Sequence, residues 1–208
     1  MAPGNGEVGG YIKYSVYMIM QEKKILRKQI SSVKKLIPLE EKIRRSYAVM
    51  ERLREHPEYK KSKKILFYWS MDDEVYTKEA VIQAYNEGKE VYLPVVEGDN
   101  LRIRLFEGAA SMVAGESFAI PEPSNESPEV FIDDIDLVVV PGVAFDAQCS
   151  RMGRGKGYYD RLLSAATKEG QPYNIGVCFD FQIVPKVPVE ECDKPLDCVI
   201  SETSLYHK

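Results

Sequence analysis

Three basic residues alternate with three glycines in the segment Arg151-Met-Gly-Arg-Gly-Lys-Gly157, and this pattern is suited to holding phosphate groups. Glycine lets the backbone approach an anion closely, because no Cβ stands in the way. Arg151, Arg154 and Lys156 add full positive charges. A helical pattern begins at Tyr158, and the N-terminus of a helix presents unpaired N–H groups and the positive end of its dipole. The segment therefore predicts a binding loop for a polyphosphate.

The residues around this loop indicate how a fold would hold it. Residues 138–140 are all valine, a β-branched run typical of a strand buried on both faces. Pro141-Gly142 ends that strand, since proline donates no hydrogen bond to a sheet. From Tyr158 onward the apolar residues recur at helical spacing. The expected order is therefore strand, long loop, glycine-rich basic loop and helix.

The loop matches neither of two common nucleotide-binding motifs. The segment 151–157 contains neither the Walker A pattern GxxxxGK[ST] nor the dinucleotide fingerprint GxGxxG. A bare GxGxG recurs by chance, so a flexible turn with solvated charges explains these few residues equally well. The longer string of residues distinguishes the two interpretations.

The string PGVAFD, followed by RMGRGKGYYDR, resembles the signature of the 5-formyltetrahydrofolate cyclo-ligase family, also called 5,10-methenyltetrahydrofolate synthetases. That signature reads PG-x-x-FD-x-x-G-x-R-L-G-[RYH]-G-x-G-[YF]-[YF]-D. The chain departs from it at Cys149, where glycine is usual, and at Met152, where leucine is usual. Methionine keeps the volume of leucine, and we expect Cys149 to stiffen the loop slightly. The resemblance covers nearly the whole chain from about Gln21 onward.

The resemblance implies an α/β fold, a three-layer α/β/α single domain with a mostly parallel sheet, spanning residues 21–208. It implies the ATP-dependent conversion of 5-formyltetrahydrofolate to 5,10-methenyltetrahydrofolate, with release of ADP and phosphate. ATP is then a co-substrate and Mg²⁺ a cofactor. In that reaction the γ-phosphoryl group of ATP moves to the formyl oxygen, and N10 of the folate closes the five-membered ring.

The same resemblance assigns roles to individual residues. It gives catalytic roles to Lys156, Arg154 and Tyr158. It places two aspartates, Asp160 and Asp197, at the magnesium ion. The residues assigned to the folate pocket are Trp69, Glu74, Phe118 and Tyr158. The residues assigned to ATP are Lys23, Arg27, Arg151, Met152, Gly153, Arg154, Gly155, Lys156, Gly157, Tyr158 and Tyr159.

Taken singly, several of these residues have an interpretation that involves no ligand. Two cations four residues apart, such as Lys23 and Arg27, most often form a solvated helix face. An aromatic residue such as Trp69 usually packs in a core, and a loop carboxylate such as Glu74 usually faces water. Phe118 is equally well explained as a buried hydrophobic residue. A carboxylate in the first turn of a helix, as expected for Asp160, is favoured by the helix dipole alone.

The chain has few residues for acid–base or nucleophilic catalysis. Its two histidines are His56 and His207, and neither fits a Ser-His-Asp or Cys-His arrangement. Cations, glycines and carboxylates suit phosphoryl transfer, in which a protein mainly positions groups and offsets charge. Two alternatives remain open. One is another phosphate-ligand α/β enzyme, such as a sugar-phosphate isomerase, which needs no ATP. The other is a non-catalytic RNA binder, whose affinity for polyanions is sensitive to salt.

The composition fits a single cytoplasmic domain. The 208 residues carry a formal net charge of −4, which argues against binding nucleic acid through bulk charge. The four cysteines show no CxxC pair, so we expect reduced thiols and a cytoplasmic location. Residues 1–20 are expected to be a disordered extension rather than a membrane anchor or signal peptide. We expect a monomer with no nucleic-acid or membrane partner.

Hydrophobic periodicity predicts helices that alternate with strands, which favours a mostly parallel sheet with helices on both faces. The expected helices span 21–37, 39–55 and 77–88, and the expected strands span 64–70, 91–96, 101–106, 138–140, 174–179 and 197–200. The first helix is expected to face the core through Leu26, Ile30, Val33 and Ile37, and the second through Leu39, Ile43, Tyr47, Met50 and Leu53.

Overall fold

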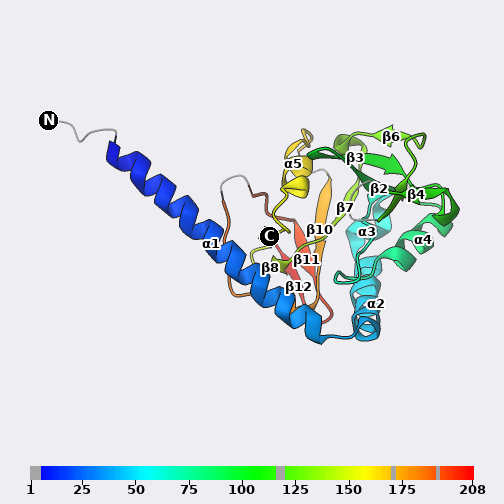
Figure 1. The fold of residues 1–208 in the computed structure, drawn as a ribbon. Helices are drawn as coiled ribbons and strands as arrows, with labels where there is room; N and C mark the ends of the chain where they lie inside the picture. Colours follow the sequence, from blue (N-terminus) through cyan, green and yellow to red (C-terminus); the bar gives the residue numbers. More distant parts are fainter. Residues whose placement is uncertain (1–5, 116–119, 170–171, 191–192) are drawn as a thin grey trace.

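The computed structural model describes residues 6–115, 120–169, 172–190 and 193–208. Its centre is an eight-stranded sheet in the order β12-β11-β10-β7-β1-β2-β3-β6 (Figure 1). The strands of this sheet are β1 (Lys64–Leu66), β2 (Glu90–Glu97), β3 (Asn100–Leu105), β6 (Glu129–Val130), β7 (Leu137–Val140), β10 (Tyr173–Val177), β11 (Cys198–Ile200) and β12 (Leu205–His207).

The middle of the sheet is parallel, and its edges are antiparallel. Strands β11, β10, β7, β1 and β2 run in one direction, whereas β12, β3 and β6 pair in the antiparallel sense. The predicted mostly parallel sheet is therefore confirmed. Because parallel strands end at the same edge, the loops that follow β1, β2 and β7 emerge close together.

Helices cover both faces of the sheet, which confirms the three-layer α/β/α arrangement. On one face, α2 (Leu39–Glu55), α3 (Pro57–Lys61) and α4 (Lys78–Asn86) bury side chains that include Leu53, Tyr59 and Val81. On the other face, α5 (Tyr158–Ser164) buries Leu162 and Leu163. Burying one such side chain contributes roughly 1.5–3 kcal/mol. In the described part of the chain, no helix has the length and apolar character that a membrane span requires.

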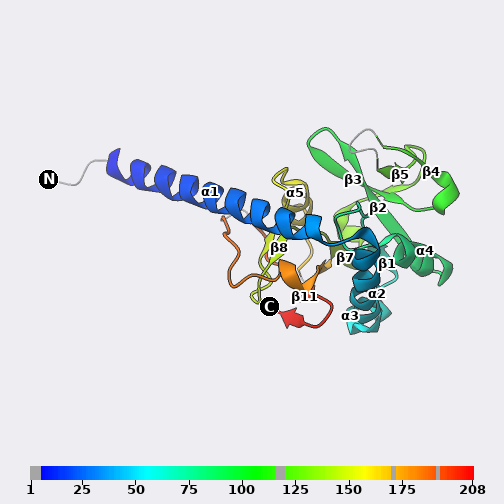
Figure 2. The ribbon, with the colours of Figure 1, turned by 60° about the horizontal axis from the view of Figure 1, so that its bottom comes forward.

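The first helix is longer than expected. α1 (Gly6–Leu36) begins at Gly6 rather than at Gln21, so it includes residues 6–20, for which a disordered extension was expected. No proline interrupts this stretch, so every turn of the helix can form its backbone hydrogen bonds. The N-terminal half of α1 projects away from the body of the molecule (Figures 1 and 2).

The C-terminal half of α1 packs against the body through a mixed face. Ile30 is buried in a cluster that includes Ala144 and Met152. The predicted apolar face is wrong at Val33, which is 40% exposed, whereas Lys34 is only 5% exposed. A buried ammonium group needs a compensating partner, and the Asp73 carboxylate, 3.7 Å away, is that partner for Lys34.

α2 has the predicted bounds but an inward face that is rotated from the predicted one. Leu39 and Tyr47 are exposed, whereas Ser46 and Val49 are buried. The Ser46 hydroxyl accepts a hydrogen bond from the Tyr76 backbone N–H at 2.8 Å. A polar residue therefore takes an inward position because it satisfies a backbone donor of the neighbouring loop.

Several short elements escaped the sequence analysis. β4 (Met112–Ala114) pairs with β5 (Pro121–Pro123), and β8 (Ala144–Phe145) pairs with β9 (Arg151–Met152). Three 3₁₀ turns are η1 (Ala109–Ser111), η2 (Ile132–Asp134) and η3 (Asp180–Gln182). Elements of two or three residues are too short to show a hydrophobic period.

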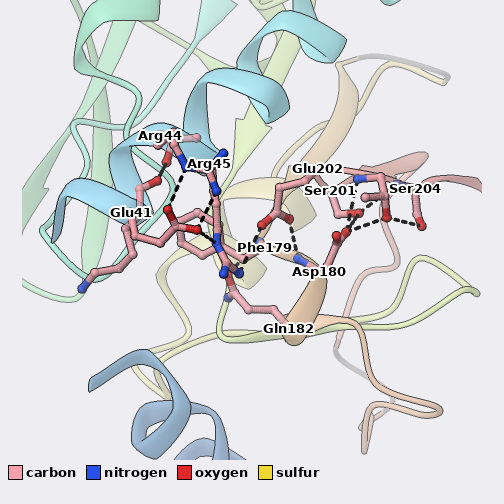
Figure 3. Close-up of polar contacts among 12 residues, drawn as sticks. Glu41, Arg44, Arg45, Phe179, Asp180, Gln182, Ser201, Glu202 and Ser204 are labelled. Atoms are coloured by element: carbon pink, nitrogen blue, oxygen red, sulfur yellow. Dashed lines mark hydrogen bonds and ion pairs between the residues drawn. The ribbon is translucent and has the colours of Figure 1, made fainter. Parts of the chain in front are cut away.

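A polar cluster lies in the turns after β10 and β11 (Figure 3). It consists of Asp180, Ser201, Glu202 and Thr203, and we call it the Asp180 cluster. The Asp180 carboxylate accepts hydrogen bonds from the hydroxyls of Ser201, at 2.5 Å, and Thr203, at 3.1 Å. The Glu202 carboxylate accepts the Asp180 backbone N–H at 2.5 Å and lies 4.0 Å from Arg45 of α2. These bonds tie α2 to the sheet.

Candidate active site

A cavity of about 170 Å³ lies where β1, β2 and β7 end. Three segments supply most of its walls: 68–74 after β1, 120–122, and 151–160, which comprises the glycine loop (residues 151–157) and the first turn of α5. Pro94 and Val96 of β2 add an apolar wall. The carboxyl edge of a parallel sheet is where α/β proteins usually bind ligands. The glycine loop therefore faces a cavity at the expected place.

The glycine loop has a backbone that favours glycine. Gly155 and Gly157 have φ angles of 101° and 70°, in the left-handed region. Gly157 is also the residue that precedes the first turn of α5. Arg27 of α1 supports the loop, because its Nε donates a hydrogen bond to the Gly153 carbonyl at 3.0 Å. The structure thus brings Arg27 and the glycine loop together, as the sequence analysis expected.

A tight turn leads into the glycine loop. Asp146 Oδ1 accepts the backbone N–H groups of Gln148 and Ser150, at 3.0 and 2.9 Å. Cys149, which stands where the family signature has glycine, is buried and has a φ angle of 60°. A residue with a Cβ pays roughly 1–2 kcal/mol in this region. Glycine is therefore the favoured residue at this position, because it adopts a positive φ angle without strain. Cys149 adopts the same backbone conformation at the expense of some folding free energy.

Arg151 is buried at the back of the cavity. One terminal nitrogen forms an ion pair with Asp160 Oδ1 at 2.5 Å, and the other donates to the Pro141 carbonyl at 3.3 Å. Its guanidinium lies 5.7 Å from the centre of the Tyr159 ring. Among the described residues, no hydrogen-bond partner reaches its buried Nε. Arg151 is thus fixed in place, and its Nε–H is an unused donor.

Arg154 links the glycine loop to the loop after β1. Its guanidinium donates to Asp73 Oδ1 at 2.5 Å and to Glu74 Oε1 at 3.1 Å. Asp73 Oδ2 also lies 3.7 Å from the ammonium nitrogen of Lys34. Burial lowers the pKa of Lys34, although the Asp73 carboxylate opposes that effect. We call Lys34, Asp73, Glu74 and Arg154 the cavity network.

Lys34 was missed by the sequence analysis, although a signal for it exists. It lies seven residues after Arg27, which places both side chains on one face of α1. The apolar pattern of the same helix favoured Val33 as the inward residue instead. The carboxylate of Asp73, which makes burial of the ammonium group tolerable, comes from a distant loop.

The two lysines assigned to ATP have different surroundings. Lys156 borders the cavity, and within the described residues its ammonium nitrogen forms no hydrogen bond or ion pair. Lys23 is buried and forms ion pairs with Glu190 at 2.8 Å and Asp193 at 2.6 Å. It lies one helical turn from Arg27 but does not line the cavity. The two carboxylates that hold Lys23 were not anticipated.

The residues assigned to the folate border the same cavity where the structure describes them. Trp69 is half-buried, and its ring lies 6.0 Å from that of Phe106. Glu74 Oε2 accepts the Met71 backbone N–H at 3.1 Å. Tyr158 lines the cavity, and its hydroxyl donates to the Gly98 carbonyl at 3.3 Å. Phe118 lies outside the described residues.

Two further residues assigned to ATP, Met152 and Tyr159, are held mainly by packing within the protein. The Met152 side chain packs in the cluster with Ile30 and does not line the cavity. Tyr159 borders the cavity, but its hydroxyl is buried without a hydrogen-bond partner among the described residues. Burial raises the pKa of Tyr159, so the phenol stays neutral.

The two aspartates assigned to magnesium lie at opposite ends of the parallel strands. Asp160 borders the cavity in the first turn of α5. Asp197 immediately precedes β11, and its Oδ2 accepts the Asn174 backbone N–H at 2.7 Å. It therefore lies at the amino ends of the parallel strands, whereas the cavity lies at their carboxyl ends. Sequence matching alone does not show at which end of a strand a residue will stand.

The cavity combines an apolar wall with cations and carboxylates. Its cations can offset charge on a chain of phosphates, and its aromatic and proline residues can contact a flat ring. Glu74 can accept hydrogen bonds from ring N–H groups. Asp160 offers the hard oxygen ligand that Mg²⁺ prefers. This arrangement suits two ligands that meet beside the glycine loop.

Comparisons with known proteins agree with this geometry. The model of the 5-formyltetrahydrofolate cyclo-ligase family matches residues 19–202. The 5-formyltetrahydrofolate cyclo-ligase of Mus musculus is 31% identical over 192 residues, covering 88% of this chain and 94% of that protein.

Two solved structures have the same fold. The 5,10-methenyltetrahydrofolate synthetase of Aquifex aeolicus superposes with a TM-score of 0.78 at 34% identity, covering 89% of this chain and 92% of that one. That of Mycoplasma pneumoniae gives a TM-score of 0.66 at 24% identity, covering 86% and 97%, and supports the fold alone. On the matches of sequence, of fold and of the glycine loop, the chain belongs to the 5-formyltetrahydrofolate cyclo-ligase family.

Proposed function

We propose that this protein converts 5-formyltetrahydrofolate to 5,10-methenyltetrahydrofolate and that ATP drives the reaction, with release of ADP and phosphate. The formyl group of the substrate is an amide on N5, and its oxygen is a poor leaving group. Transfer of the γ-phosphoryl group of ATP to that oxygen turns it into phosphate. N10 then attacks the formyl carbon, the phosphate leaves, and the five-membered ring closes.

The glycine loop forms the phosphate side of the site in this proposal. Gly155 and Gly157 have positive φ angles that favour glycine, and the guanidinium groups of Arg27 and Arg161 lie against the side where a Cβ would stand. Lys156 borders the cavity with an ammonium group that no other described residue pairs. Arg151 keeps an unused buried Nε. A phosphoryl transfer needs little else from a protein than positioning and charge, and it needs no enzyme nucleophile.

The loop after β1 forms the folate side. Glu74 accepts hydrogen bonds from the pterin N–H groups, and Trp69 and Tyr158 enclose the ring system. Arg154 already bridges the two sides, because it extends from the glycine loop to Glu74. A ligand that engages Glu74 therefore competes with Arg154 and frees its guanidinium for the phosphates.

The residues at the cavity fit a magnesium ion bound mainly by ATP. Such an ion usually takes one or two protein carboxylates and completes its shell with phosphate oxygens and water. Asp160 would hold it, since one oxygen pairs with Arg151 and the second is left for a ligand. When bound, Mg²⁺ offsets charge on the phosphates. Action as a monomer in the cytoplasm, without nucleic acid or membrane, stays a prediction.

The observation that carries the proposal is that one cavity joins the glycine loop to Trp69 and Glu74. The test is a mixture of the protein, 5-formyltetrahydrofolate, ATP and Mg²⁺, in which the methenyl chromophore is followed by absorbance. The chromophore should appear, and it should not appear when ATP is replaced by a non-hydrolysable analogue. A sugar-phosphate isomerase would form no methenyl chromophore, and its own activity would not require ATP. Absence of the chromophore in the complete mixture would therefore contradict the proposal.

A further inference from the structure

Three side chains that commonly bind metals meet at the edge of the sheet farthest from β6. Ligand atoms of His56, Cys198 and His207 all lie within 4.8 Å of one another. The ring centres of the two histidines are 5.8 Å apart. The cavity described above includes none of the three. Nothing in the proposed cyclo-ligase reaction uses them.

The fold itself produces this convergence. Cys198 and His207 are directly paired residues of the antiparallel strands β11 and β12, so their side chains point to the same face of the sheet. His56 stands between α2 and α3, which cover that face. The three groups therefore come from β11, from β12 and from the short junction between α2 and α3.

Two of the three residues are buried and the third is exposed, so an ion can be held inside the protein and still be reached from solvent. Cys198 is fully buried and His56 is 7% exposed, whereas His207 is exposed on the last strand. A metal can thus enter from the side of His207. Tyr173, whose ring lies 5.8 Å from that of His56, provides an apolar wall on the inner side.

The ligand types select the metal. Imidazole nitrogen and thiolate sulfur favour Zn²⁺ over Mg²⁺ or Ca²⁺, which prefer oxygen. Zinc bonds of 2.0–2.3 Å in a tetrahedron place neighbouring ligand atoms roughly 3.5 Å apart. Ligand atoms that lie within 4.8 Å of one another therefore need to close by about 1 Å, which small rotations of the three side chains can supply. Water completes the fourth position.

One existing hydrogen bond must be exchanged for the metal. His56 Nδ1 accepts the Glu58 backbone N–H at 3.2 Å, at the start of α3. Coordination through Nδ1 replaces that bond directly. Coordination through Nε2 moves the ring proton to Nδ1 and has the same consequence. The Cys198 thiol loses its proton to solvent in either case.

We propose that His56, Cys198 and His207 form a binding site for one Zn²⁺ ion, which fastens the C-terminal strand β12 to the turn between α2 and α3. The alternative is a buried thiol that packs beside two histidines and binds nothing. The proposal does not depend on the cyclo-ligase activity, since the three residues lie outside the cavity.

The test is a titration of the full chain, without added affinity histidines and in a thiol-reducing buffer, with Co²⁺ as the spectroscopic substitute for Zn²⁺. A thiolate bound to Co²⁺ gives a charge-transfer band in the near ultraviolet. We expect this band to saturate at one Co²⁺ per chain and to disappear when Zn²⁺ is added. In nuclear magnetic resonance spectra, the Glu58 amide should shift, because its hydrogen-bond acceptor changes.

Substitutions identify the residues that produce the charge-transfer band. Cys198→Ala should abolish it, and His207→Ala should weaken Co²⁺ binding at least about tenfold. Cys178→Ala, which removes another buried thiol, should leave the band unchanged. If Cys198→Ala does not fold, His207→Ala decides, since that side chain is exposed. A wild-type protein with no band at millimolar Co²⁺, or a band that His207→Ala leaves at full strength, would overturn the proposal.

Discussion

The cavity network and the Asp180 cluster both follow the carboxyl ends of parallel strands, yet their carboxylates are satisfied in different ways. In the cavity network, Asp73 and Glu74 are held mainly by the side-chain cations Arg154 and Lys34. In the Asp180 cluster, the carboxylates accept hydrogen bonds from hydroxyls and backbone N–H groups of the neighbouring turn (Figure 3).

The difference has a physical consequence. A backbone donor cannot leave without unfolding its turn, so the Asp180 cluster is committed to structure. A guanidinium on a side chain can rotate to another anion at the cost of one ion pair. Arg154 has 43% of its side chain exposed, so its pairing with Glu74 is open to exchange. The first network can thus serve a ligand, whereas the second maintains the fold.

The largest expected effect comes from Lys156, whose ammonium group has no partner in the part of the chain that the structure describes. Lys156→Met keeps most of the aliphatic stem and removes the charge. We expect kcat to fall on the order of 10²–10³-fold, because charge on the moving phosphoryl group is greatest in the transition state. The KM for the folate should change much less. Steady-state kinetics of methenyl formation measure both constants.

The matched control for this change is Lys60→Met. Lys60 is exposed on α3, far from the cavity lining. The Lys60→Met substitution should leave kcat unchanged and shift the free energy of unfolding by less than about 0.5 kcal/mol. Equal kcat values for Lys156→Met and the wild type would remove the phosphate role from Lys156.

The second effect separates the two networks. Glu74→Gln should weaken use of the formyl-folate by roughly 10- to 100-fold, the cost of losing hydrogen bonds to a charged group, and should weaken ATP binding less. The matched change in the Asp180 cluster is Glu202→Gln, which should leave both ligands unaffected. Titrations of each ligand measure the difference, and equal losses for ATP and folate would assign Glu74 a structural role.

A smaller effect is expected at the metal position. Asp160→Asn keeps an oxygen that can accept from Arg151 but removes the negative charge. The Mg²⁺ concentration for half-maximal rate should rise about tenfold, and the melting temperature should also fall, because the buried Arg151 guanidinium loses the charge that compensates it. A titration of rate against Mg²⁺ tests this, and an unchanged Mg²⁺ dependence would exclude Asp160 from the site.

The smallest effect on activity belongs to Asp180→Ala. This change removes the acceptor for Ser201 and Thr203, so the free energy of unfolding should fall by about 1–3 kcal/mol. Kinetic constants at low temperature should match the wild type. Urea denaturation measures the loss of stability, and steady-state kinetics measure kcat and KM. A fall in kcat without a fall in stability would show that the Asp180 cluster serves the reaction rather than the fold.

The sequence predicted the parts of the fold that repeat a pattern. The valine run of β7 and the helix over 39–55 lie where periodicity placed them, since long amphipathic or fully apolar runs have few other solutions. The site followed from the glycine loop and the family string. The loop, Trp69 and Glu74 do line one cavity.

What escaped prediction depends on contacts between distant segments. Lys34 is buried only because Asp73 arrives from another loop, and Lys23 only because Glu190 and Asp193 do. Asp197 resembled a metal ligand by sequence, yet it stands at the amino end of its strand. The strand expected over 197–200 already placed Asp197 at the start of a strand, so its assignment to magnesium rested on the family match alone.

The most direct test of the central claim is the number of ADP molecules released per methenyl-folate formed by the wild-type protein. If ATP phosphorylates the formyl oxygen in the cavity, the ratio should be one, and ADP should not accumulate when formyl-folate is omitted. Methenyl formation without ADP release, or ADP release that ignores the folate, would contradict the assignment of both ligands to one site.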